Sequence, residues 1–223
     1  TAPDPDHATR LRALSLADPD AVVTGASAEY FHGWRTQPPA DVEAASGLAS
    51  RPGFALTRRL IPRRLTTRSD GVRYTSRALT AVDLATTRGV EEVDEALRRR
   101  IPLEKLWDAY LGTPNRRRRR RLYRWLTESR SQPWSPLERA AHLALHHGRV
   151  RGWVANHTVA LDAEGARAHP DIAFRTLKLA IEVDGWRWHA GEAAFERDRL
   201  RDVRLGELGW QVVRFPGAWV LKH

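Results

Sequence analysis

Acidic residues gather at two consecutive apolar segments near the end of the chain. Asp171 precedes the first segment, and Glu182 and Asp184 end the second, which runs over residues 177–184. Alternate side chains of a strand share a face, so Glu182 and Asp184 should lie side by side, away from the apolar positions. Neighbouring carboxylates repel each other and raise one another's pKa unless a cation lies between them. A hairpin across Arg175 and Thr176 would bring Asp171 to the same place.

Three carboxylates on rigid strands form a site for a hard cation. Mg²⁺ prefers such oxygen ligands and keeps several waters, which leaves room for a phosphate substrate. Asp184 also has a purely structural explanation, because strand ends near loops often carry acids and Asp184-Gly185 is itself a turn signal. Both explanations stay open for Asp184 taken alone.

A helix is expected directly before these strands. Ser135, Pro136 and Glu138 stand at the N-cap, N1 and N3 positions of a capping box. Apolar residues then recur at helical spacing up to Leu145, and Gly148 can end the helix. The cap alone accounts for Glu138 without any role in catalysis. His142, His146 and His147 on the same helix hint at zinc, but we place them on different faces.

The remaining elements define the fold class. We expect strands over 172–174, 177–183 and 210–215, with a helix over 193–208 before the last strand. With a short strand after Trp153, the order is α-β-β-β-α-β, which predicts a central mixed sheet flanked by helices. In the preceding part we expect helices over 7–18, 80–87 and 90–99, and short strands and turns over 37–70. The sequence therefore predicts an α/β protein with two domains. Residues 1–130 form a smaller α+β domain, and residues 131–223 form the domain with the central mixed sheet, which begins with a linker over 131–134.

Positive charge dominates the composition. The 223 residues include 37 Lys and Arg against 27 Asp and Glu, a formal net charge of +10, and nearly all the cations are arginine. Such an excess favours a polyanionic partner, and we expect DNA. The run Arg116 to Arg121 fits a phosphate-binding stripe, of which Arg116, Arg118 and Arg120 are the candidates. A solvated helix face explains the run equally well.

Other function classes are excluded by what the sequence lacks. The chain has no cysteine, so disulfides, thiolate catalysis and Cys-ligated zinc are ruled out. No apolar run reaches the ~20 residues of a membrane helix, and the start at Thr1 shows no signal peptide. We expect a cytoplasmic, nucleoid-associated protein that begins within a longer chain.

Several short motifs carry a resemblance to a known family. Pro170-Asp171 followed by Ile181-Glu182-Val183-Asp184-Gly185 resembles the signature of the PD-(D/E)XK nucleases. Together with Ser135 to Glu138, His189, Asp198, Arg199, Arg204, Leu208-Gly209 and Val213 to Phe215, it is similar to the DUF559 group of that superfamily and, more distantly, to the Vsr repair endonucleases. Residues 7–130 resemble the region that precedes DUF559 in actinobacterial proteins related to AbiEi-type antitoxins. The resemblance implies a restriction-endonuclease-like domain over 131–223.

The resemblance also implies roles for individual residues. Asp171, Glu182 and the main-chain carbonyl of Val183 would hold Mg²⁺, for which Mn²⁺ can substitute, and Asp184 and Glu138 would complete or orient the site. Asp184 stands where most of the superfamily has lysine, a change that the DUF559 group shares, and His189 would supply the general acid or base. DNA contacts are expected from Trp186, Trp188, Arg199 and Arg204.

The sequence thus favours a metal-dependent DNA endonuclease in repair or defence, directed by DNA structure, mismatch or modification. The ion would polarise a phosphate oxygen and lower the pKa of a water that attacks in line. One alternative is a catalytically weak or inactive DNA-binding regulator of antitoxin type. Another is an interaction module of a defence complex.

Overall fold

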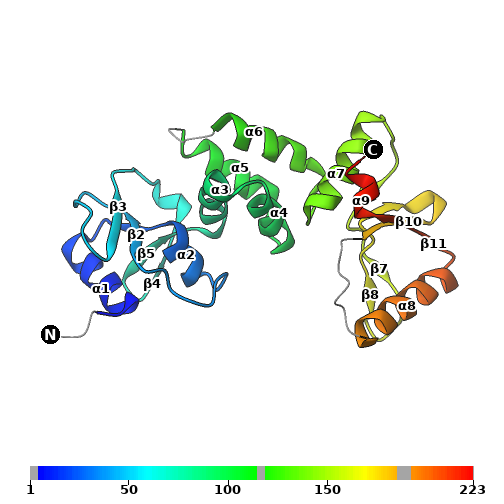
Figure 1. Cartoon of the computed structure of the whole chain (residues 1–223), viewed down its shortest axis with the longest axis horizontal. Coiled ribbons are helices and arrows are strands. Elements are labelled where there is room, and N and C mark those ends of the chain that lie inside the picture. Colours follow the sequence, from blue (N-terminus) through cyan, green and yellow to red (C-terminus); the bar gives the residue numbers. More distant parts are fainter. Residues whose placement is uncertain (1–4, 115–118, 185–191, 223) are drawn as a thin grey trace. The chain divides into compact units, whose positions relative to one another are not determined.

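A computed structural model describes the chain apart from residues 1–4, 115–118, 185–191 and 223, and apart from the side chains of 192–195. The chain divides into two compact units, Thr1–Thr127 and Glu128–His223, which are considered separately below (Figure 1). The mixed sheets and surrounding helices confirm the predicted α/β class. The sequence-based boundary after residue 130 lies close to the division.

The first unit contains a mixed sheet of five short strands. Their order is β3-β2-β1-β5-β4, with β1 parallel to β5, β2 parallel to β3, and antiparallel pairing elsewhere. The hairpin between β4 and β5 turns at Asp70 and Gly71, which both have positive φ (48° and 80°), as tight hairpin turns require. The strands are β1 (Val22–Val23), β2 (Val42–Ala45), β3 (Phe54–Thr57), β4 (Thr66–Ser69) and β5 (Val72–Thr75).

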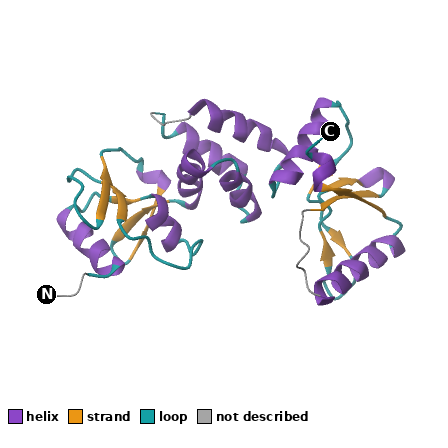
Figure 2. Ribbon diagram, in the orientation of Figure 1, coloured by secondary structure: helices purple, strands orange, loops and turns teal. Residues whose placement is uncertain are grey.

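Helices complete the first unit, as the purple elements of Figure 2 show. Leu14 of the first helix packs on β2, and the Phe31 ring stacks on Tyr74 of β5 at 3.7 Å between centroids. The predicted helices over 80–87 and 90–99 are present, whereas the fifth one was not predicted. The helices are α1 (His7–Ala17), α2 (Gly25–Phe31), α3 (Arg77–Arg88), α4 (Glu91–Arg98), α5 (Leu103–Leu111) and α6 (Arg119–Glu128).

The second unit is built on a mixed four-stranded sheet. The order is β11-β10-β9-β6, with β10 parallel to β11 and antiparallel to β9. A separate hairpin, β7 with β8, precedes β9 and was not predicted. The elements are α7 (Pro136–His147), β6 (Val154–Ala155), β7 (Val159–Ala160), β8 (Arg167–Ala168), β9 (Ile172–Phe174), β10 (Leu179–Asp184), α8 (Glu192–Glu207), β11 (Gln211–Pro216) and α9 (Gly217–Val220).

Two apolar clusters hold this unit together. Ile172 and Val183 of the sheet pack with Ala141 of α7. Leu205 of α8 is fully buried against Val159 and Ala168 of the hairpin. The first cluster fixes α7 against β9 and β10, and the second anchors the end of α8. The carboxylates described below therefore come from elements held by the core.

Residues 131–134, predicted as a linker at the start of the second domain, make hydrogen bonds within the second unit. The Ser131 hydroxyl lies 2.8 Å from His146 Nε2, and the Gln132 carbonyl accepts a hydrogen bond from Asn156 at 3.1 Å. The sequence looks like a linker here because Pro133 is typical of irregular structure. In the fold, Gln132 before it adopts a positive φ of 51°.

Candidate functional site

The antiparallel pairing of β9 with β10 brings Asp171 to the middle of the second strand. Ile172 pairs with Ile181, so Asp171, one residue earlier, reaches the next residues of β10. Its Oδ2 accepts a hydrogen bond of 2.7 Å from the Val183 N–H. The predicted hairpin is therefore present, although its turn extends to Lys178, which has a φ of 49°. As a result, the second strand begins at Leu179 rather than Leu177.

Buried Glu182 and partly buried Asp171 form a pair of acids in this hairpin. Glu182 is only 8% exposed, and burial, followed by the charge of Asp171, raises its pKa to about 7. Burial also raises the pKa of Asp171, and its hydrogen bond from Val183 opposes this only in part. The two side chains are thus held where ionisation of both is costly.

Glu138 brings a third buried carboxylate from α7. It is 7% exposed, and burial is the main cause that raises its pKa to about 7, with a contribution from the charge of Asp171. The Ser135 hydroxyl accepts from the Glu138 N–H at 3.1 Å, as a helix N-cap does. The reciprocal half of the predicted capping box is wrong, because Glu138 Oε2 accepts from the Trp134 N–H at 2.9 Å and not from Ser135.

Asp184 has a different environment from Glu182. Its side chain is 51% exposed and forms an ion pair of 3.0 Å with Arg214 of β11. Arg214 also binds Asp202 of α8 through two nitrogen atoms at 2.8 and 3.2 Å. The charge of Asp184 still contributes to raising the pKa of Asp171. The structure therefore places Asp184 at the exposed edge of the acidic group.

Arg201 of α8 is the cation next to the buried acids, and the sequence reasoning missed it. Its Nη2 lies 3.5 Å from Glu182 Oε1, and its other nitrogens lie 3.6 Å from Asp198 and 3.9 Å from Asp202. Glu182 Oε1 and Arg201 Nε are both buried without a hydrogen-bond partner. Its contact with Glu182 of β10 depends on how α8 packs, which the charge pattern along the helix does not reveal.

His142 is a second residue whose position the sequence did not reveal. It is fully buried, burial lowers its pKa to about 4, and its Nε2 lies 3.4 Å from the Asp171 carbonyl. Its ring and that of His146 both lie against Trp153, at 5.0 and 5.1 Å between centroids. The prediction that these two histidines occupy different faces is therefore wrong, because a spacing of four residues places them on one face of α7.

The donor set can be tested against the expected metal. In residues 5–114, 119–184 and 192–222, no three His, Asp or Glu side chains group closely enough to hold an ion. Two features nevertheless fit a hard divalent cation: Asp171 and Glu182 supply carboxylate oxygens, and Glu182 Oε1 has no hydrogen bond. The acidic pair fits as a partial ligand set, and the Val183 carbonyl stays a predicted ligand.

The predicted DNA contacts are only partly within the described residues. Trp186, Trp188, His189, Arg116 and Arg118 lie outside them.

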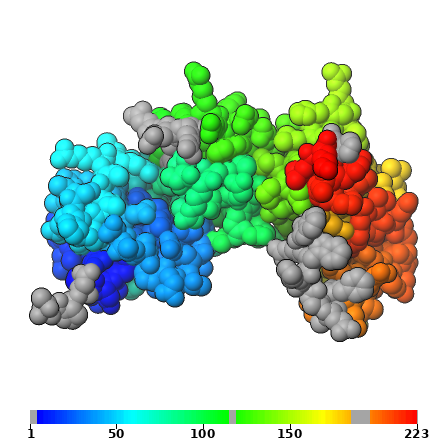
Figure 3. Space-filling model, in the orientation of Figure 1, coloured from blue at the N-terminus to red at the C-terminus, as the bar shows by residue number. Residues whose placement is uncertain are grey.

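Among the remaining contacts, Arg120 of α6 and Arg199 of α8 are exposed, and the surface of α8 is coloured orange in Figure 3. Arg204 forms an ion pair of 2.8 Å with Asp162. Arg119 packs its guanidinium over Tyr110, 4.2 Å from the ring centroid, so the arginine run is not uniformly solvated.

Comparisons with known proteins leave the family open. No family model matches the chain, and no solved structure matches it. The uncharacterized proteins MT2308 and Rv2248 of two Mycobacterium tuberculosis strains are each 44% identical to it over 43 residues. That stretch is 19% of this chain and only 16% of either relative's length. Within the described residues, no helix is long and apolar enough to cross a membrane.

Proposed function

We propose that the second unit is a divalent-cation-dependent nuclease that hydrolyses phosphodiester bonds in DNA. The observation that carries the proposal is the pair of partly buried Asp171 and buried Glu182, which share a hairpin and both have a pKa raised by desolvation. Natural proteins rarely keep buried acids without a matching cation or hydrogen bonds, and such perturbed groups gather at functional sites. The resemblance to PD-(D/E)XK nucleases of the DUF559 group gives the same residues the same role.

The chain's own residues have distinct parts in this proposal. Asp171 and Glu182 hold the cation, and the Val183 N–H fixes the Asp171 carboxylate at 2.7 Å. When bound, the cation supplies Lewis acidity towards the phosphate and the attacking water. Glu138 of α7 helps to orient the two carboxylates. Arg201 neutralises part of the negative charge of Glu182. His189 stays the sequence-based candidate for proton transfer.

The positive charge supports DNA as the substrate. The net charge of +10 favours a polyanion, and Arg120 and Arg199 leave exposed guanidinium groups on helices of the two units. A role in DNA repair or defence, at the nucleoid of the cytoplasm, follows from that substrate and belongs to the same proposal.

A second candidate is a DNA-binding regulator that does not cleave. The contact of Arg201 with Glu182 favours it, because a protein cation already neutralises part of the acidic pair. The absence of a three-residue metal group among the described residues points the same way. This candidate predicts binding that weakens with salt and no cation-dependent cleavage.

The test is cleavage of several DNA forms with Mg²⁺ or Mn²⁺ by the wild type and by Asp171→Asn and Glu182→Gln. Both substitutions keep the shape of the side chain, and the amide oxygen introduced by Asp171→Asn could still accept from the Val183 N–H. We expect a loss of about a thousandfold, or roughly 4 kcal/mol of transition-state stabilisation. Glu207→Gln, at an exposed position on the same unit, is the matched control and should cleave normally. Equal activity of all four proteins would refute the proposal, and DNA binding without cleavage would favour the regulator.

A further inference from the structure

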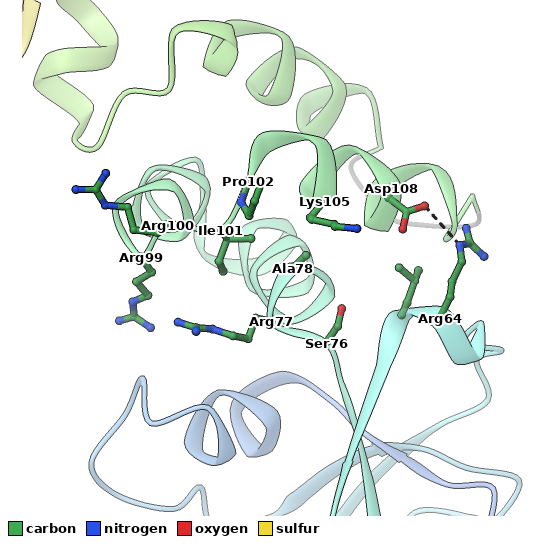
Figure 4. A pocket seen from close by; sticks show the side chains of 11 residues that line it. Arg64, Ser76, Arg77, Ala78, Arg99, Arg100, Ile101, Pro102, Lys105 and Asp108 are labelled. Atoms are coloured by element: carbon green, nitrogen blue, oxygen red, sulfur yellow. Dashed lines mark hydrogen bonds and ion pairs between the residues drawn. The ribbon is translucent and has the colours of Figure 1, made fainter. Parts of the chain in front are cut away.

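The first unit contains a basic cleft that the nuclease proposal does not use. Its volume is about 420 Å³, and five of its eleven lining residues are Arg or Lys against one acid, Asp108. The walls come from the start of α3, the segment between α4 and α5, the first turn of α5, and the 3-10 turn before β4 (Figure 4). All of these elements belong to one compact unit.

One end of the cleft gathers two guanidinium groups. Arg77 and Arg99 point to the same side in Figure 4, and their central carbons lie 5.7 and 4.7 Å from the centre of the Trp34 ring. Arg99 is paired with Glu95 at 2.6 Å. Arg77 has no carboxylate partner in the part of the chain that the structure describes. Like charges on one indole repel each other, so an anion at this end would be stabilised.

The other end of the cleft carries a further cation, Lys105. Lys105 points towards Asp108 in Figure 4, and Asp108 is already paired with Arg64 at 3.4 Å. Lys105 itself forms no ion pair among the described residues. It lies in the first turn of α5, whose N-cap Pro102 provides no side-chain hydrogen bond. The partial positive charge of a helix start adds to that of Lys105, and Glu104 of the same turn offsets part of it.

The middle of the cleft is apolar. Leu65, Ala78 and Ile101 line it and are 3–8% exposed, and Pro102 lies beside them. The volume of the whole cleft falls within the range of about 300–1,000 Å³ typical of sites for small ligands. An apolar floor between two cationic ends suits a ligand that has a nonionic body and more than one negative group.

We propose that this cleft binds a ligand with more than one phosphate group, with one phosphate at Arg77 and another at Lys105. The nonionic part of the ligand, a base or sugar, packs on Ile101 and Pro102. Arginine forks and the lysine ammonium match phosphate oxygens. A nucleoside 3′,5′-bisphosphate, whose two phosphates flank the sugar, and the backbone of a nucleic acid strand share this chemistry, and they are separated by the experiment.

The experiment is calorimetric titration of the full chain in EDTA with deoxyadenosine 3′,5′-bisphosphate, deoxyadenosine and a short single-stranded oligodeoxynucleotide. We expect the bisphosphate to bind at least about tenfold more tightly than deoxyadenosine. The double variant Arg77→Ala/Lys105→Ala should lose at least about tenfold in bisphosphate affinity. The matched control Arg58→Ala/Arg68→Ala removes the same charge from exposed positions outside the cleft and should bind within about twofold of the wild type.

Thermal unfolding by circular dichroism establishes that each variant is folded before titration. An oligonucleotide that competes with the bisphosphate identifies a nucleic acid strand as the source of the phosphates, and one that does not identifies the free nucleotide. The proposal is overturned if deoxyadenosine binds as well as the bisphosphate. It is also overturned if the cleft variant and the control lose the same affinity.

Discussion

Two equally buried glutamates, one in each unit, have opposite electrostatic environments. Glu29 and Glu182 are each 8% exposed. Arg88 binds both oxygens of Glu29 at 2.8 and 2.7 Å, and this pairing lowers the pKa of Glu29 below its ordinary value. Glu182 has a single cation at 3.5 Å and one oxygen without a hydrogen bond, and its pKa is raised to about 7.

The difference separates a structural acid from one available for function. A bidentate arginine satisfies the carboxylate of Glu29 and fixes α2 to α3. Glu182 is held in the folded state although burial and Asp171 oppose its charge. Burial alone therefore does not point to a functional acid, whereas burial without a complete set of partners supports the role proposed for Glu182.

The largest expected effect is on the structural pair. Glu29→Gln leaves the Arg88 guanidinium without its main partner, which should lower the free energy of unfolding by about 3 kcal/mol. Arg88 is 41% exposed and also contacts Glu92. The expected fall in the free energy of unfolding is therefore at the lower end of the range for breaking a buried ion pair. Urea unfolding at pH 8 measures the loss. A loss under about 0.5 kcal/mol would show that the bidentate contact does not stabilise the unit.

Glu182→Gln should change the free energy of unfolding in the opposite direction to Glu29→Gln. Removing a carboxylate whose charge is opposed by its surroundings should raise the free energy of unfolding at pH 8 by roughly 2 kcal/mol in the absence of metal. The same urea experiment measures it, with Glu207→Gln as the exposed control. Destabilisation by Glu182→Gln would remove the distinction between the two glutamates.

The pH dependence of this effect has a definite sign. The pKa of folded Glu182 is raised to about 7, whereas the ordinary pKa of a glutamate is 4.5, so the stability that this residue contributes falls as the pH rises from about 4.5 to about 7. His142, with a pKa lowered to about 4, contributes stability that is instead lost as pH falls from 6.5 to 4. Subtracting the wild-type profile from that of Glu182→Gln isolates the glutamate. The difference should grow with pH and level off above about 7.

A smaller effect is expected from the neighbouring cation. Arg201→Gln removes the described cation that forms an ion pair with Glu182 and leaves the charge of Arg214, so the pKa of Glu182 should rise further and the free energy of unfolding should fall by about 1 kcal/mol at pH 8. NMR titration of labelled glutamate carboxyl carbons follows the pKa. Arg197→Gln, at an exposed position of the same helix, should leave it unchanged. An unchanged titration in both variants would mean that Arg201 does not act on Glu182.

The smallest effect concerns the helix that carries Glu138. Ser135→Ala removes the N-cap hydrogen bond to the Glu138 N–H and should cost about 1 kcal/mol. Glu138 should keep its contact with the Trp134 N–H, because that bond does not involve Ser135. Urea unfolding measures the cost, and a raised stability would show that Ser135 does not cap α7.

Local patterns predicted most of the elements and the hairpin that brings Asp171 to β10. Alternation and turn residues encode the strand pair, and Ser135 with Pro136 encodes the start of α7. The sequence did not predict that Glu182 is buried while Asp184 is exposed, because both lie on the same face by alternation. Their difference depends on the neighbouring elements that cover the strand.

Contacts between distant elements account for the other omissions. Arg201 reaches Glu182 from α8, and His142 reaches the Asp171 carbonyl from α7. Neither contact leaves a signal in the spacing of residues along the chain. The basic cleft likewise joins side chains from α3 and α5, and the second of these helices was not anticipated.

The central claim is that Asp171 and Glu182 together bind a divalent cation. Titration of Mn²⁺ into the full chain at pH 8, followed by electron paramagnetic resonance, counts bound ions directly. The account predicts a Mn²⁺ site in the wild type and in Glu207→Gln that is lost in Asp171→Asn/Glu182→Gln. Equal Mn²⁺ binding by all three proteins, or none by any of them, would contradict it.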